Sequence, residues 1–136
     1  MRAGDTYIRA GKHVRTDPHL WVVISDPSGS TNLVSVNFTS QRTDKDQSCV
    51  ISPGEHPFVT KESVILYSGA RVTPESAILA AVHAGAMVLH SRASAKLLAK
   101  IRKGASTPKL PLQAKRILQA QGIIPLDPPP SPPAKK

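Results

Sequence analysis

Three polar residues at the ends of two predicted strands are best placed to do chemistry in this sequence. Residues 21–24 and 33–39 are rich in β-branched and aliphatic side chains and are separated by a loop-forming stretch, which predicts a hairpin. In an antiparallel pair, the start of one strand lies beside the end of the other. We therefore expect His19, which precedes the first strand, to lie close to Thr39 and Ser40, which end the second.

These residue types suit proton transfer and anion stabilisation on a phosphodiester, since a histidine can exchange protons and an arginine can bind the phosphate. Arg42 follows on the adjacent loop, and His56 lies on the later Pro-Gly turn segment. The candidate catalytic residues are His19, Thr39, Ser40, Arg42 and His56. The alternative is that His19 is an edge residue, Thr39 a strand former and His56 a residue bonded to the backbone.

The single cysteine, Cys49, excludes an intramolecular disulfide framework. Cys49 and His56 could form a nucleophile pair, but a cysteine in an apolar strand is more often a small core residue. His19, Cys49 and His56 could hold zinc, yet nothing in their spacing requires it. Phosphate-loop, dinucleotide, zincin and α/β-hydrolase motifs are absent from the sequence. We expect no metal and no cofactor.

The net charge of +9 comes entirely from the C-terminal part of the chain. Residues 1–76 hold equal numbers of acids and bases, whereas residues 77–136 hold ten bases and one acid, Asp127. This asymmetry suits an anionic partner, namely nucleic acid, an acidic protein or a membrane surface, although it is also compatible with a merely solvated face. The candidate nucleic-acid-binding residues are Lys96, Lys100, Arg102, Lys103, Lys115 and Arg116.

The order of elements predicts an α+β protein. Short strands are expected within residues 1–73, a barrel or sandwich pattern, and basic helices within 74–122, at about 74–84, 94–104 and 111–121. Residues 87–90 could continue the first helix or form one more strand. Residues 123–136 are expected to be a disordered proline-rich tail, and residues 41–47 a mobile polar loop.

The longest uncharged apolar run, residues 77–89, is shorter than the roughly 20 residues that cross a bilayer. The first five residues, Met-Arg-Ala-Gly-Asp, lack the apolar run of a secretory signal. We expect a cytoplasmic protein with no membrane partner.

Several motifs resemble the PemK/MazF toxins of bacterial toxin–antitoxin modules. They are Gly4-Asp5-Thr6, the segment from His19 to Pro27, Val36-Asn37-Phe38-Thr39-Ser40, and Ser48-Cys49-Val50-Ile51 followed by Gly54-Glu55-His56-Pro57-Phe58. The resemblance covers about residues 1–72. It implies a small SH3-like (MazF-like) β-barrel followed by two or three short helices. It also implies a metal-independent endoribonuclease, an antitoxin partner and a homodimer.

The sequence departs from those toxins before the aliphatic strand, where they carry Arg-Pro and this chain has Pro18-His19. If the activity persists, His19 takes the place of that arginine as a general acid or base. The leading hypothesis is a toxin-like protein that cleaves or binds RNA. The alternative is a non-enzymatic interaction or accessory module that binds an acidic protein or nucleic acid through its basic helices.

Overall fold

The structure is a computed structural model, and it describes residues 1–9, 19–29, 31–40 and 47–127. Arg42, residues 41–46 of the loop predicted at 41–47, and residues 128–136 of the tail predicted at 123–136 lie outside these residues. The described elements, in chain order, are β1 Thr6–Arg9, β2 Leu20–Val23, a 3-10 turn Pro27–Gly29, β3 Asn32–Ser40, β4 Val50–Ile51, β5 Ser63–Pro74, α1 Glu75–His83, β6 Met87–His90, α2 Ala95–Gly104 and α3 Leu112–Ala120.

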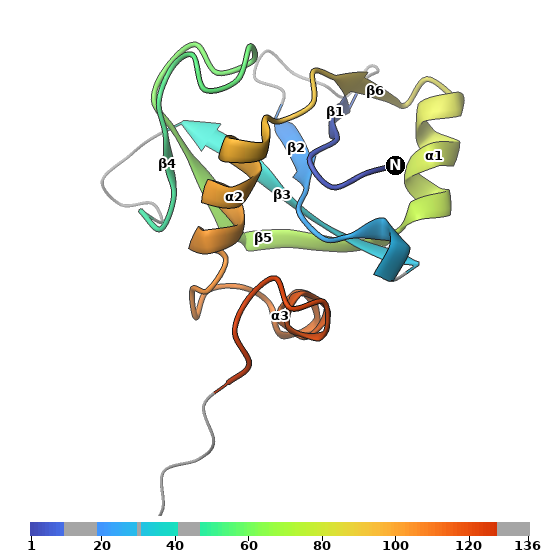
Figure 1. Ribbon diagram of the computed structural model, residues 1–136. Coiled ribbons are helices and arrows are strands. Elements are labelled where there is room, and N and C mark those ends of the chain that lie inside the picture. Colours follow the sequence, from blue (N-terminus) through green and yellow to red (C-terminus); the bar gives the residue numbers. More distant parts are fainter. Residues whose placement is uncertain (10–18, 30, 41–46, 128–136) are drawn as a thin grey trace, which may run out of the picture.

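The strands form one antiparallel sheet in the order β4-β5-β3-β2-β1-β6. The sheet curls into a half-barrel, and three helices pack around it (Figure 1). The register of β3 against β5 shifts between Ser35 and Asn37, and such an irregularity bends and twists a strand pair. The predicted α+β class is confirmed, and the half-barrel is compatible with a small barrel.

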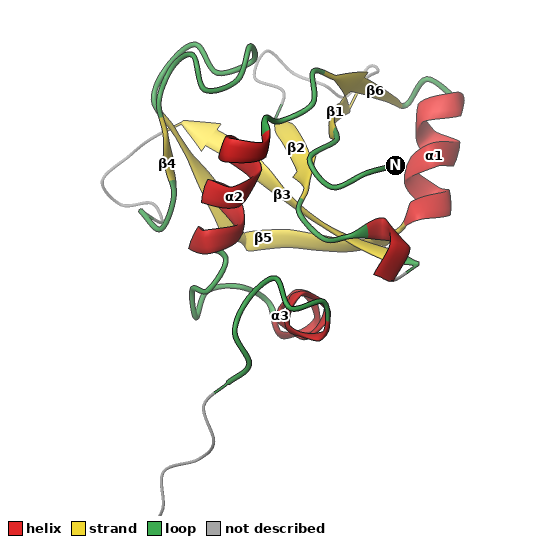
Figure 2. Cartoon of the chain, viewed as in Figure 1, coloured by secondary structure: helices red, strands yellow, loops and turns green. Residues whose placement is uncertain are grey.

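Both faces of the sheet are covered, and this explains the unbroken apolar run of β2. Leu20 and Val22 point into the main core, which also contains Leu97, Ile101 and Leu118 from the last two helices. Trp21 and Val23 point to the opposite face, where Ile78 of α1 completes a smaller cluster. Figure 2 shows α1 and α2 as separate helices on the two sides of the strands. The central strands are therefore held from both faces.

Helix α2 begins and is anchored through specific contacts. The Ser94 hydroxyl caps it, since it accepts a hydrogen bond from the Leu97 N–H at 3.0 Å. The buried Tyr67 hydroxyl of β5 donates to the carbonyl of Ile101 at 2.6 Å. These contacts fix the helix on the sheet.

No helix in the described part of the chain is long and apolar enough to cross a membrane.

Residues 87–90 form the strand β6, which was one of the two alternatives for this segment. It pairs with β1, so that Thr6 lies opposite His90 and Ile8 opposite Val88. The sheet therefore includes a strand beyond residue 73, the boundary predicted between a barrel and a helical extension. That division into domains stays a prediction, but β6 interrupts the expected run of helices.

Gly104, at the end of α2, is required by close packing. A Cβ atom at this position would lie 2.3 Å from the Tyr67 hydroxyl and 3.0 Å from the Cys49 Cβ. Helix propensity alone would make Gly104→Ala stabilising by up to about 1 kcal/mol. We predict the opposite, a loss of about 1–3 kcal/mol in the free energy of unfolding, because the added methyl displaces the tyrosine that anchors the helix. Denaturant unfolding measures it.

Tyr67→Phe provides the control, because it removes the hydroxyl that the new methyl would meet. The double variant should lose less than the sum of the two single changes. An unfolding free energy of Gly104→Ala equal to or above that of the wild type would contradict this account of α2.

Candidate functional site

A pocket of ≈ 280 Å³ lies where β2 begins, β3 ends and β5 begins. The pairing of Trp21 with Asn37 and of Ser40 with Ser63 places these three strand ends together. The residues around the pocket are His19, Phe38, Thr39, Ser40, Phe58, Val59, Thr60, Lys61 and Ser63. The structure thus brings together His19, Thr39 and Ser40, as the hairpin predicted.

One ring nitrogen of His19 is fixed by the backbone. Nδ1 lies 3.1 Å from the carbonyl oxygen of Phe38, and a carbonyl can only accept, so Nδ1 carries the proton of this hydrogen bond. The neutral ring then has an unprotonated Nε2. Among the described residues this nitrogen makes no hydrogen bond, and the side chain is exposed at the pocket. His19 is therefore oriented to accept a proton at Nε2.

The pocket also contains a cation and several hydroxyl groups. Lys61 is exposed at its rim and follows Thr60 on the segment that leads into β5. Ser63 is buried, and its hydroxyl donates to the carbonyl of Lys61 at 3.0 Å, which fixes the backbone beside that lysine. A basic nitrogen, an ammonium group and hydroxyls in one small pocket form a set that suits an oxyanion such as a phosphate group.

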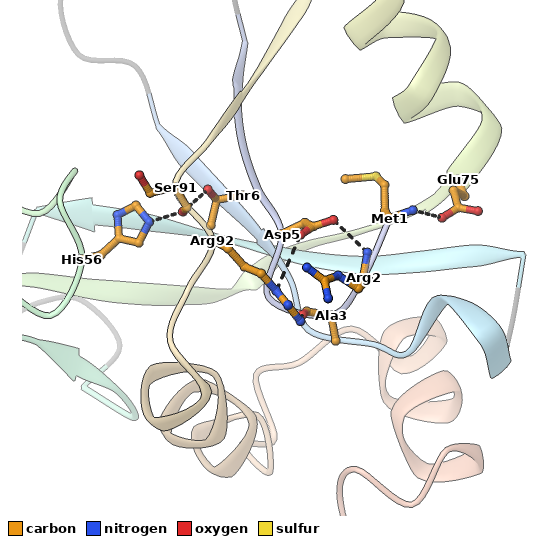
Figure 3. A network of polar contacts seen from close by, with 9 residues as sticks. All are labelled: Met1, Arg2, Ala3, Asp5, Thr6, His56, Glu75, Ser91 and Arg92. Carbon is orange, nitrogen blue, oxygen red and sulfur yellow. Dashed lines mark hydrogen bonds and ion pairs between the residues drawn. The ribbon is translucent and has the colours of Figure 1, made fainter.

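His56 lies outside the lining of this pocket, and both of its ring nitrogens bond the backbone. Nε2 donates to the carbonyl of Ser91 at 2.5 Å, while Nδ1 accepts from the Phe58 N–H at 3.0 Å. Figure 3 shows the contact to Ser91, whose carbonyl also accepts from the Thr6 hydroxyl at 2.7 Å. His56 as a whole residue is 2% exposed. His56 thus holds the segment at 56–58 against β6 and β1.

Burial lowers the pKa of His56 below its ordinary value. The hydrogen bond to Ser91 acts in the opposite direction, and the nearby His90, with ring centres 5.4 Å apart, lowers the pKa further. Protonation would also place a hydrogen on Nδ1, which faces the Phe58 N–H. The neutral form is therefore the one that fits this arrangement.

Some of the candidate nucleic-acid-binding residues have partners within the chain. Lys100 pairs with Glu55 at 2.9 Å, and Lys115 pairs with Asp127 at 2.6 Å. The Arg102 Nε donates to the Ile24 carbonyl at 2.8 Å. Burial lowers the pKa of Arg102, and the facing Asp26 opposes that shift. These contacts give part of the basic set a structural role.

Lys96, Lys103 and Arg116 are exposed on α2 and α3. These three are the members of the set that the structure leaves at the surface for an anionic partner.

Cys49 is buried in the main core, and its Sγ lies 3.9 Å from the Lys100 carbonyl oxygen. The core interpretation of this cysteine therefore fits its position. Arg42 falls outside the described residues, so its role at the pocket stays a prediction. Within the described part of the chain, no group of three or more His, Cys, Asp or Glu side chains is arranged to hold a metal ion.

Six of the pocket residues were not among the sequence candidates, and five of them lie on the segment before β5 or at its start: Phe58, Val59, Thr60, Lys61 and Ser63. The sequence carried little indication of these residues. They follow His56 on a polar segment, and they come next to β3 only because Ser40 pairs with Ser63. The sequence alone does not give that register.

Comparisons with known proteins add no family to this description. No protein-family model matches the chain, and no curated protein matches it. The function is therefore argued from the pocket itself.

His56 makes the stability of the fold dependent on pH. Because its pKa is lowered in the folded state, the unfolded chain binds more protons once the pH falls below about 6.5. His56 thus contributes stability above that pH which is lost as the pH falls toward its folded pKa. We predict a smaller loss of unfolding free energy between about pH 7 and about pH 5 in His56→Gln than in the wild type.

The matched control is His83→Gln, which removes an exposed histidine at the end of α1. Denaturant unfolding at both pH values should give the wild-type pH dependence for this variant. If His56→Gln also keeps the wild-type dependence, the protonation state assigned to His56 is wrong.

Proposed function

We propose that this protein binds RNA at the pocket between β2, β3 and β5 and cleaves it with His19 as the general base. The observation that carries this proposal is the orientation of His19. Its Nδ1 is committed to the Phe38 carbonyl, so that Nε2 is left for proton transfer beside Lys61 and the hydroxyl side chains. Geometry of this kind suits attack by an alcohol on a phosphodiester.

In the proposed step, Nε2 of His19 removes the proton of a ribose 2′-hydroxyl. The 2′-oxygen attacks the adjacent phosphorus, a P–O2′ bond forms, and the P–O5′ bond breaks. The 5′-oxygen leaves with a proton supplied by solvent, and the product is a 2′,3′-cyclic phosphate. Lys61 stabilises the negative charge that develops on the phosphorus oxygens. The 2′-hydroxyl requirement selects RNA over DNA.

The resemblance to PemK/MazF toxins agrees with this proposal, since it implies RNA cleavage without a metal ion. It also implies an antitoxin and a homodimer, and both stay predictions. In this chain the proposed base is a histidine at the position before the aliphatic strand, where those toxins have Arg-Pro.

We expect His19→Ala to slow single-turnover cleavage of a mixed-sequence RNA about 100- to 10,000-fold, which is the usual contribution of one general base. The rate of the wild type should be unchanged by EDTA. His83→Ala is the control, because it removes an exposed histidine at the end of α1 that does not line the pocket. A wild-type rate in His19→Ala would exclude His19 as the base.

A second candidate function rests on a groove of ≈ 630 Å³ between α2 and the segment after α3. Most of its lining side chains are apolar, and Arg102 and Lys103 are the basic ones. Its lining includes Ala95, Leu98, Ala99, Arg102, Lys103 and Ile123. An apolar floor with a basic edge suits an acidic amphipathic segment of a protein partner. This candidate corresponds to the non-enzymatic interaction module.

Charge reversal separates the two candidates. Lys96→Glu with Lys103→Glu should abolish binding of an acidic partner and leave RNA cleavage within about threefold of the wild type, since both side chains lie outside the catalytic pocket. Cleavage assays and titration with a Glu/Leu amphipathic peptide measure the two effects. A cleavage loss as large as that of His19→Ala would contradict the assignment of catalysis to the pocket.

A further inference from the structure

The pocket has an aromatic wall as well as its polar groups. Phe38 and Phe58 both border it, but Phe38 is 4% exposed and belongs to the core. Phe58 is only partly buried, and it packs on the edge of the core. Phe58 is therefore the aromatic ring that a molecule in the pocket can contact.

Phe58 is held in place by its neighbours. Its backbone N–H donates to Nδ1 of the buried His56 at 3.0 Å. The next residue is also fixed, because the Val59 N–H donates to the His56 carbonyl at 2.9 Å. The ring meets His90 edge to face, with centres 5.7 Å apart and planes at 85°. A ring fixed in this way loses little conformational freedom when a ligand stacks on it.

We propose that Phe58 is a stacking platform for one unpaired base of the RNA. This inference rests on the proposed function, because it assumes that the same pocket takes the phosphate and ribose. His19 and Lys61 supply the groups for the phosphate, and Phe58 supplies an apolar surface in the same small cavity. A volume of ≈ 280 Å³ is at the small end of ligand pockets, which suits a single nucleotide.

The platform requires an unpaired base. A base within a duplex is covered on both faces by its neighbours, so it stacks on a protein ring only when it is splayed out. Stacking on an aromatic ring tolerates any base, because every base has a flat π-face. The substrate class is therefore single-stranded RNA or a loop, with weak preference for base identity at this position.

The test combines removal of the base with removal of the ring. The probe is a short single-stranded 2′-fluoro RNA, which lacks the nucleophile and is not cleaved, with each position in turn made abasic. The wild type should lose about 5- to 150-fold in affinity at one position. Phe58→Leu should show a similar loss with the intact probe and no further loss with the abasic one. Phe58→Tyr should bind as the wild type does.

A fluorescent base provides a second readout that does not depend on affinity. With 2-aminopurine at the sensitive position, binding to the wild type and to Phe58→Tyr should quench the fluorescence, and binding to Phe58→Leu should quench it much less. If Phe58→Leu fails to fold, the abasic series and the quenching by Phe58→Tyr still decide the question.

The outcomes separate this inference from the function on which it rests. If the wild type binds no RNA, both fall. If RNA is bound and cleaved but the losses from the abasic position and from Phe58→Leu are additive, the stacking platform alone is overturned. Equal affinity for a duplex and a single strand would also overturn it.

Discussion

The antiparallel pairing of β2 with β3 is the constraint on which the candidate site depends. Val22 lies opposite Val36, and both point into a fully buried core, so a shift of one residue would move apolar side chains out of that core. The same register brings His19 to the end of β3 and gives its Nδ1 the Phe38 carbonyl as a partner. The packing of aliphatic side chains thus determines which ring nitrogen of His19 is available for proton transfer.

The other wall of the pocket depends on contacts between distant parts of the chain. The segment that carries Phe58 is held by His56, which reaches the Ser91 carbonyl just beyond β6. That carbonyl is in position because β6 pairs with β1, and Thr6 also donates to it. The edge strand β6 therefore supports a pocket formed at the ends of the inner strands β2, β3 and β5, through the neutral His56.

Local patterns predicted the parts of this structure that local patterns determine. The β2–β3 hairpin and the meeting of His19 with Thr39 both follow from residues near each other in sequence. For His56 a bond to the backbone was raised as the alternative, but neither its partner Ser91 nor the contact of Gly104 with Tyr67 was predicted, because these partners lie 35 and 37 residues away. The charge distribution predicted a basic helical half. It did not predict the ion pairs of Lys100 with Glu55 and of Lys115 with Asp127. Lys61 was missed because the β3–β5 register that places it is non-local.

We propose that RNA binds where β2 begins and β3 ends, and not along the basic helices. Chemical-shift mapping by NMR with a 2′-fluoro single-stranded RNA tests it most directly. We expect the largest shifts at the His19 ring and at the backbone amides of Thr60 and Lys61, with a salt-sensitive but smaller response on α2. Shifts confined to Lys96, Lys103 and their neighbours would contradict it.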